Sequence, residues 1–233
     1  MREAVERLYT VFARHRLAAR IDGCPHCVTD EDQHLLRRSP LRELGEADLS
    51  RFVAKAITTW GNVDDLRHFL PRILDLALPG GGVIEIDTVA AKLDLARWWE
   101  WPMDERDAVR ACFAALWRRT LEREPEERPA VLLLDTLATA FDDLAPFLDA
   151  WTARLHRWAD HHPAVRQFAD TAGTIVATSP TLRHPQVVVW LLTLLPHLEL
   201  LFKEIEEVDL GLAEALLDTH DQLVLLRGTI SLR

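Results

Sequence analysis

The chain is poor in several residue types, and each shortage excludes a class of protein. Only three cysteines occur among its 233 residues, which excludes a disulfide-rich secreted scaffold. Lysine occurs only at Lys55, Lys92 and Lys203, and the formal net charge is -10. No basic run is longer than a pair of arginines, so the basic face of a nucleic-acid-binding protein is missing and no nucleic-acid partner is expected.

Long apolar runs and secretory signals are also lacking. No uninterrupted apolar stretch reaches the ~18 residues that cross a bilayer, and the nearest candidate, 187–201, contains Pro196, His197 and Glu199. Arginines are spread over residues 1–20, which contain no apolar segment with a small-residue cleavage site. The sequence therefore predicts a cytoplasmic protein that has no membrane partner.

Apolar residues recur at helical spacing along the whole chain. The stretch 48–59, for example, places Leu49, Phe52, Val53, Ala56 and Ile57 at i, i+3, i+4, i+7 and i+8, which is one face of a helix. Further helices are expected over 3–17, 30–36, 64–78, 88–99, 105–121, 129–141, 143–161, 163–178, 185–205 and 209–227. The 48% hydrophobic content is enough for a sizeable core. We predict a single all-α domain over 1–233, a HEAT-like or orthogonal multi-helix array with a soft division near 122–129.

Proline and glycine indicate where these helices begin, bend or end. Pro71 lies inside 64–78, so that helix is expected to begin near Leu70, after a tight turn. Pro196 is expected to kink the helix 185–205. Three glycines at 80–82 end a helix, and the strand-like residues 83–87 that follow are expected to form an extended linker, because a lone strand has no partner.

The sharpest chemical feature of the chain is Cys24-Pro25-His26-Cys27. This spacing lets two sulfurs bind one metal ion or bond to each other. In the cytoplasm such a pair is more often a metal or redox site than a structural disulfide. Zinc takes about four nitrogen or sulfur ligands, so we predict a zinc site of Cys24, Cys27, His34 and His68, with His26 as a further candidate. No second CxxC pair completes the set at a standard spacing.

Two alternatives remain for the cysteine pair. The tetrapeptide resembles the active site of DsbA-type thiol oxidoreductases, which implies redox catalysis. Those enzymes place CxxC between a strand and a helix, whereas 11–21 is expected to be helical here, so metal binding is favoured over redox catalysis. The other alternative is that Cys24 and Cys27 are small half-buried residues in a turn bent by Pro25. Cys112 lies on an apolar helix face and is expected in the core.

Tryptophans indicate contact with another protein. Successive helix positions point 100° apart, so Trp98, Trp99 and Trp101 cannot all face one core, and at least one is expected to be exposed or to meet another chain. The alternative is that Trp101 leaves the helix and folds beneath it. Trp60 lies in a polar loop that suits partner or ligand contact, although it also suits packing against a helix end. We predict partner contacts at Trp60, Trp98, Trp99 and Trp101.

The segment 22–76 is similar to a widespread bacterial protein family without a known activity. The matching stretches are Ile21-Asp22-Gly23-Cys24-Pro25-His26-Cys27, Pro40-Leu41-Arg42-Glu43-Leu44, Asp48-Leu49-Ser50, Thr58-Thr59-Trp60-Gly61 and Phe69-Leu70-Pro71-Arg72-Ile73-Leu74. In that family the position of His26 is often cysteine, and this departure weighs against His26 as an essential ligand. The resemblance implies no activity, substrate or partner.

Established catalytic motifs are missing. The chain contains no G-x-S-x-G, P-loop, G-x-G-x-x-G or HExxH pattern. The sequence therefore favours a non-enzymatic binding protein whose partner is another protein, such as an adaptor or an immunity-type inhibitor. The alternative is a zinc-binding or thiol-dependent protein centred on Cys24 and Cys27, with zinc as its cofactor.

Overall fold

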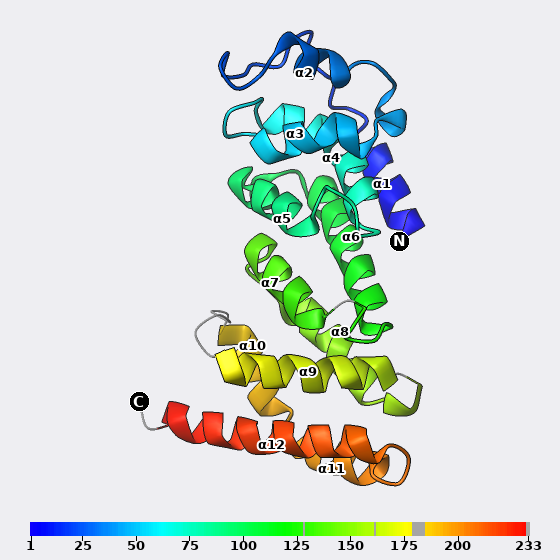
Figure 1. The fold of residues 1–233 in the computed structure, drawn as a ribbon, viewed down its shortest axis with the longest axis vertical. Coiled ribbons are helices and arrows are strands. Elements are labelled where there is room, and N and C mark those ends of the chain that lie inside the picture. Colours follow the sequence, from blue (N-terminus) through cyan, green and yellow to red (C-terminus); the bar gives the residue numbers. More distant parts are fainter. Residues whose placement is uncertain (128, 161, 179–184, 232–233) are drawn as a thin grey trace. The chain divides into compact units, whose positions relative to one another are not determined.

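The protein is all-α, as the apolar spacing predicts (Figure 1). The computed structural model describes residues 1–127, 129–160, 162–178 and 185–231. Across these ranges helix follows helix, and the only strand-like pairings are isolated bridges from Trp60 to Gly23 and to Ala56.

The chain divides into two compact units, Met1–Leu116 and Trp117–Arg233. The boundary lies inside helix α6 (Met103–Leu121), shortly before the soft division expected near 122–129. The single domain over 1–233 stays a prediction.

Unit 1 is built around helix α4. It contains α1 (Arg2–Phe12), α2 (Asp30–Leu35), η1 (Leu41–Glu43), α3 (Glu46–Lys55), α4 (Val63–Ala77), α5 (Ile86–Leu95), η2 (Trp98–Glu100) and most of α6. Helix α4 contacts α1, α3 and α5. The buried ring of Phe52 lies 4.8 Å from that of Phe69 and 5.4 Å from that of Trp60, measured between ring centres. This packing holds the loop after α3 against the core.

Unit 2 has its own aromatic core. It contains the end of α6 and α7 (Ala130–Ala140), α8 (Ala145–Leu155), η3 (Trp158–Asp160), α9 (His162–Thr178), α10 (Pro185–Thr193), α11 (Leu195–Ile205) and α12 (Leu210–Ser231). Helix α12 lies along α9 and α11 (Figure 1). The ring of Trp151 lies 5.2 to 6.0 Å from those of Trp117, Phe168 and Trp190. The buried indoles of Trp117 and Trp151 donate to the carbonyls of Phe147 and Ala164 at 2.8 and 2.9 Å, as buried tryptophan requires.

Helix α4 runs unbroken through Pro71, so the expected start near Leu70 is wrong. Proline removes one backbone hydrogen bond of the helix. Two features outweigh that loss. Asn62 caps the helix by accepting from the N–H groups of Asp64 and Asp65 at 2.8 and 3.2 Å, and the apolar residues on both sides of Pro71 are fully buried.

Other helix ends differ from the predicted ones. Helix α1 ends at Phe12 and α3 at Lys55, each earlier than expected. Helix α5 begins at Ile86, so Ile86 and Asp87 belong to a helix and not to the extended linker expected over 83–87. Thr29 caps α2, with its hydroxyl accepting from the Asp32 N–H at 3.2 Å.

The bend expected at Pro196 is confirmed. Helices α10 and α11 meet at an angle of 53°, with Pro196 in the first turn of α11. In the described ranges no single helix has the length and apolar composition to cross a membrane, and only this bent pair meets both criteria jointly.

Candidate functional site

Residues 22–28 form a tight turn, called here the cysteine turn. The N–H groups of Cys27 and Val28 both donate to the carbonyl of Cys24 at 2.9 Å, so the chain reverses and returns Cys27 beside Cys24. Val28 is buried, while Cys24 and Cys27 are half-buried and not joined by a disulfide. The turn therefore presents two neighbouring free thiols to solvent.

The cysteine turn is anchored to the loop that follows α3. The Cys24 N–H donates to the Thr59 carbonyl at 2.9 Å, and the Gly61 N–H donates to the Asp22 carbonyl at 2.6 Å. Trp60 lies beneath the turn, where a methyl group at Gly23 would come 3.3 Å from its ring. Trp60 is buried, so the predicted partner contact at this residue is wrong, and packing against the helix end is the correct interpretation.

Hydrogen bonding around Cys24 favours the ionised form of its thiol. The backbone N–H and side chain of His26, together with the Cys27 thiol, lower the pKa of Cys24 to about 7. Hydrogen bonds to the charged form favour ionisation. Burial, by contrast, raises the pKa of Cys112 to about 12, which confirms that this residue belongs to the core. The Cys24 thiol therefore ionises more readily than an ordinary cysteine.

Two cations of α3 border the turn. Arg51 donates to the carbonyl of Cys27 at 3.2 Å, and the ammonium of Lys55 donates to the same oxygen. Arg51 also pairs with the buried carboxylate of Asp32 at 3.1 Å. These contacts hold the Cys27 end of the turn against α3.

A strained residue lies in the adjoining loop. Ile57 has a φ of 69°, a left-handed conformation that is a genuine outlier for a β-branched side chain. Three successive N–H groups, those of Thr58, Thr59 and Trp60, donate to the carbonyl of Lys55 at 3.0 to 3.2 Å and hold the loop in place. Backbone strain of this kind clusters at functional sites, which supports the choice of the cysteine turn and this loop as the candidate site.

The predicted zinc ligands are not brought together. His34 is exposed on α2, and Nδ1 of His68 lies 2.8 Å from the carbonyl of His15, which follows α1. Within the described ranges no group of three or more His, Cys, Asp and Glu side chains is arranged to hold a metal ion. The four-ligand site is therefore not formed, because the ring of His68 lies at the carbonyl of His15. Metal binding by Cys24 and Cys27 stays a prediction.

One of the three neighbouring tryptophans is exposed, as predicted. Trp98 and Trp101 are 1% and 4% exposed, whereas Trp99 is 38% exposed. The indole of Trp101 donates to the Ala96 carbonyl at 3.2 Å, so Trp101 folds beneath the helix end. Partner contacts predicted at Trp98 and Trp101 are wrong because both side chains belong to the core, and Trp99 alone of the three presents a ring to solvent.

Sequence reasoning did not find the buried carboxylate of Glu105, which is 1% exposed. It accepts from Nε of Arg14 at 2.9 Å and lies 2.8 Å from Nε2 of His15. Nε of Arg67 is 3.4 Å away. A glutamate in the first turn of a helix suggests only a favourable dipole interaction, so no sequence signal marks this cluster. Its burial and pairing indicate a structural role.

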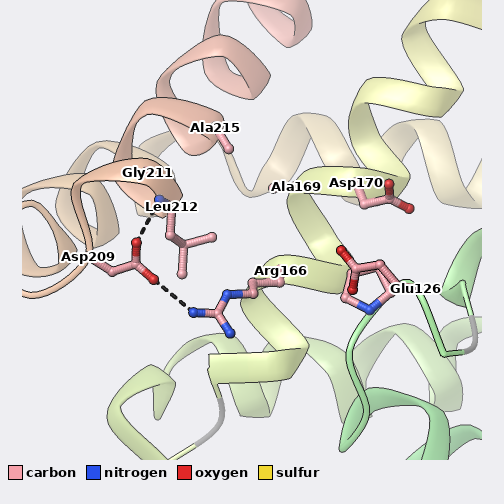
Figure 2. Close-up of a pocket in the computed structure, with 9 residues that line it drawn as sticks. Glu126, Arg166, Ala169, Asp170, Asp209, Gly211, Leu212 and Ala215 are labelled. Atoms are coloured by element: carbon pink, nitrogen blue, oxygen red, sulfur yellow. Dashed lines mark hydrogen bonds and ion pairs between the residues drawn. The ribbon is translucent and has the colours of Figure 1, made fainter.

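Unit 2 has a pocket of about 470 Å³ beside Arg166 (Figure 2). Arg166 pairs with Glu124 at 3.0 Å and with Asp209 at 2.8 Å. Burial, reinforced by the nearby Glu126, raises the pKa of Asp170 on the pocket wall. Asp209 also accepts from the Leu212 N–H at 3.0 Å, the capping role expected of an aspartate there. Asp209 and Arg166 are therefore both engaged with residues of unit 2 itself.

Comparison with known proteins yields no relative: no protein-family model, no curated protein and no solved structure matches the chain. The resemblance of 22–76 to a bacterial family therefore stays a prediction.

Proposed function

We propose that this protein binds a metal ion through the thiols of Cys24 and Cys27. The observation that carries the proposal is the geometry of the turn: the Cys27 N–H donates to the Cys24 carbonyl at 2.9 Å, which brings the two half-buried cysteines together in a turn open to solvent. Two thiolates separated by two residues are a common half-site for zinc and other soft cations.

The surroundings of the turn support this proposal. Hydrogen bonds from Cys24 to Thr59 and from Gly61 to Asp22 hold the turn against the core, so little ordering is required when a cation binds. Arg51 and Lys55 donate to the Cys27 carbonyl and hold the other end of the turn against α3. Cys112 lies apart in the core and takes no role.

Elemental analysis of the purified, reduced protein tests this function. One metal ion per chain is expected, either as purified or after loading with Zn²⁺ or Co²⁺. Cys24→Ser and Cys27→Ser should each abolish binding, whereas Cys112→Ser, which removes a thiol elsewhere, should retain it. Failure of both Zn²⁺ and Co²⁺ to bind, with Cys24 and Cys27 still titrating as free thiols, would reject the proposal.

A second candidate function, contact with another protein, is supported by the surface around Trp99. Leu95 and Met103 are also exposed and lie four residues before and after it. Exposed tryptophan is enriched at interface hot spots. This surface fits the binding-protein function that the sequence favours, namely an adaptor or an immunity-type partner.

Sedimentation of the purified protein tests the simplest form of that contact, which is self-association. Trp99→Ala should weaken association by ~2 kcal/mol, the threshold for a hot spot. Val83→Ala, a change at another exposed apolar residue, is the matched control. If wild type and Trp99→Ala sediment identically over the full concentration range, self-association through Trp99 is rejected.

A further inference from the structure

Helix α12 carries a stripe of exposed apolar side chains. Its inner face packs on α9, α10 and α11 (Figure 1) through buried residues three and four positions apart, among them Leu212, Leu216 and Leu223. Leu210, Leu217 and Val224 are instead 60%, 45% and 47% exposed. Single exposed leucines are ordinary, but these three residues are seven positions apart and therefore follow one line along the helix.

Carboxylates alternate with these apolar residues. Glu214 lies four positions after Leu210, and Asp221 lies four positions after Leu217, a spacing that puts neighbours on the same side of a helix. Both carboxylates are exposed. The five residues Leu210, Glu214, Leu217, Asp221 and Val224 are called here the outer seam. Apolar and acidic side chains follow one another along it.

The surroundings of the outer seam are acidic as well. Residues 195–231 contain eight acidic and two basic side chains, a net charge of −6 compared with −10 for the whole chain. The two basic residues are Lys203 on α11 and Arg227 on α12. The ring of His220 lies 3.2 Å from Asp221 and 3.6 Å from Glu199 of α11. A surface that combines exposed apolar side chains with this charge favours a partner that is apolar and basic.

An amphipathic helix has the shape and periodicity to match this pattern. Its leucines would bury the apolar residues of the outer seam, and its lysines or arginines would face Glu214 and Asp221. Charged residues beside an apolar seam set partner choice between paired helices. A second copy of the chain matches poorly, because its own outer seam would bring the same carboxylates against these two. Anionic lipids would be repelled by the same charges.

We infer that the outer seam binds a basic amphipathic helix of another protein, which lies alongside α12. The inference goes beyond both functions proposed above, because neither the cysteine turn nor Trp99 takes part in it. It also depends on unit 2 alone, so the failure of metal binding or of self-association through Trp99 leaves it standing.

Fluorescence anisotropy with a labelled synthetic peptide and the full-length protein tests this inference. The peptide has three heptads, each with leucine at the first position, lysine at the fifth and alanine elsewhere, which mirrors the outer seam. We expect saturable binding of one peptide per chain. A second peptide of equal composition and charge carries lysine at the third position, about 200° from leucine, and should bind much more weakly.

Variants of the protein locate the binding surface. Leu217→Ala should weaken binding about tenfold, since it removes the central apolar contact, and Val224→Ala should act in the same direction. Leu132→Ala is the matched control, because Leu132 is 64% exposed on α7, and it should leave affinity unchanged. Glu214→Gln should weaken binding about threefold at low salt, whereas Glu3→Gln, which removes the same charge from α1, should have no effect. Circular dichroism checks that each variant stays helical.

Several outcomes would overturn the inference. Equal affinity for the two peptides would show attraction by net charge alone, and equal affinity in wild type and both seam variants, Leu217→Ala and Val224→Ala, would place the contact elsewhere. A dimer in sedimentation that Leu217→Ala abolishes would assign the outer seam to a second copy. Flotation with phosphatidylcholine vesicles that Leu217→Ala abolishes would assign it to a membrane surface.

Discussion

The buried carboxylate of Glu105 offers the sharpest test of what stabilises unit 1. Glu105→Gln keeps the size of the side chain and removes its charge, so the change creates no cavity. The carboxylate pairs with Arg14, His15 and Arg67 at 2.7, 2.8 and 3.4 Å. Without it, Arg67 keeps the exposed carboxylate of Asp64 at 3.1 Å and the ring of Trp101 at 4.6 Å, but its largely buried guanidinium loses the buried carboxylate.

The expected loss follows from the burial of these groups. Breaking a buried ion pair costs about 3–5 kcal/mol. The lower end applies here, because Arg14 is half-exposed and keeps its partner Asp104 at 2.8 Å. A loss of ~3 kcal/mol corresponds to a fall in melting temperature of about 6–12 °C for a chain of this size.

Asp104→Asn provides a matched control. Asp104 pairs with the same Arg14, but its side chain is 50% exposed, and exposed pairs contribute about 0–1 kcal/mol. Urea denaturation followed by circular dichroism measures the free energy of unfolding of both variants. Equal losses in the two variants, or a loss below ~1 kcal/mol for Glu105→Gln, would refute the argument that burial makes the Glu105 cluster strong.

Three further outcomes are expected. Alkylation of Cys24, measured by mass spectrometry, should rise with pH around a midpoint near 7 as its thiolate forms. Cys112 should stay unmodified in the folded protein. A midpoint near the usual cysteine pKa of about 8.5 would contradict the lowered pKa of Cys24. Trp98→Ala should lower the free energy of unfolding by about 3–5 kcal/mol, whereas Trp99→Ala should cost far less, and equal losses would contradict their different burial. Gly61→Ala should destabilise the protein by at least ~1 kcal/mol, because Gly61 has a φ of 70° and an added methyl group would lie 3.0 Å from Ile21 and Asp65. An unchanged melting temperature would show that the loop adapts to the methyl group.

The sequence by itself determined the features that depend on near neighbours in the chain. Apolar spacing indicated the helices, because residues three and four positions apart share one helix face. The proximity of Cys24 and Cys27 followed from their separation alone. The exposure of one residue among Trp98, Trp99 and Trp101 was predicted from helix geometry, although α5 ends at Leu95 and these residues lie in and after the short helix η2.

Only the tertiary structure decided which distant residues meet. His68 lies at the carbonyl of His15, 53 positions away, and is therefore not a ligand of the cysteine pair. The packing of Phe52 on Trp60 buries a tryptophan that local polarity suggested was exposed. Glu105 meets Arg14 across 91 positions. Such contacts form because burying apolar surface brings helices together, and the one-dimensional pattern of the chain does not specify which polar groups that packing makes neighbours.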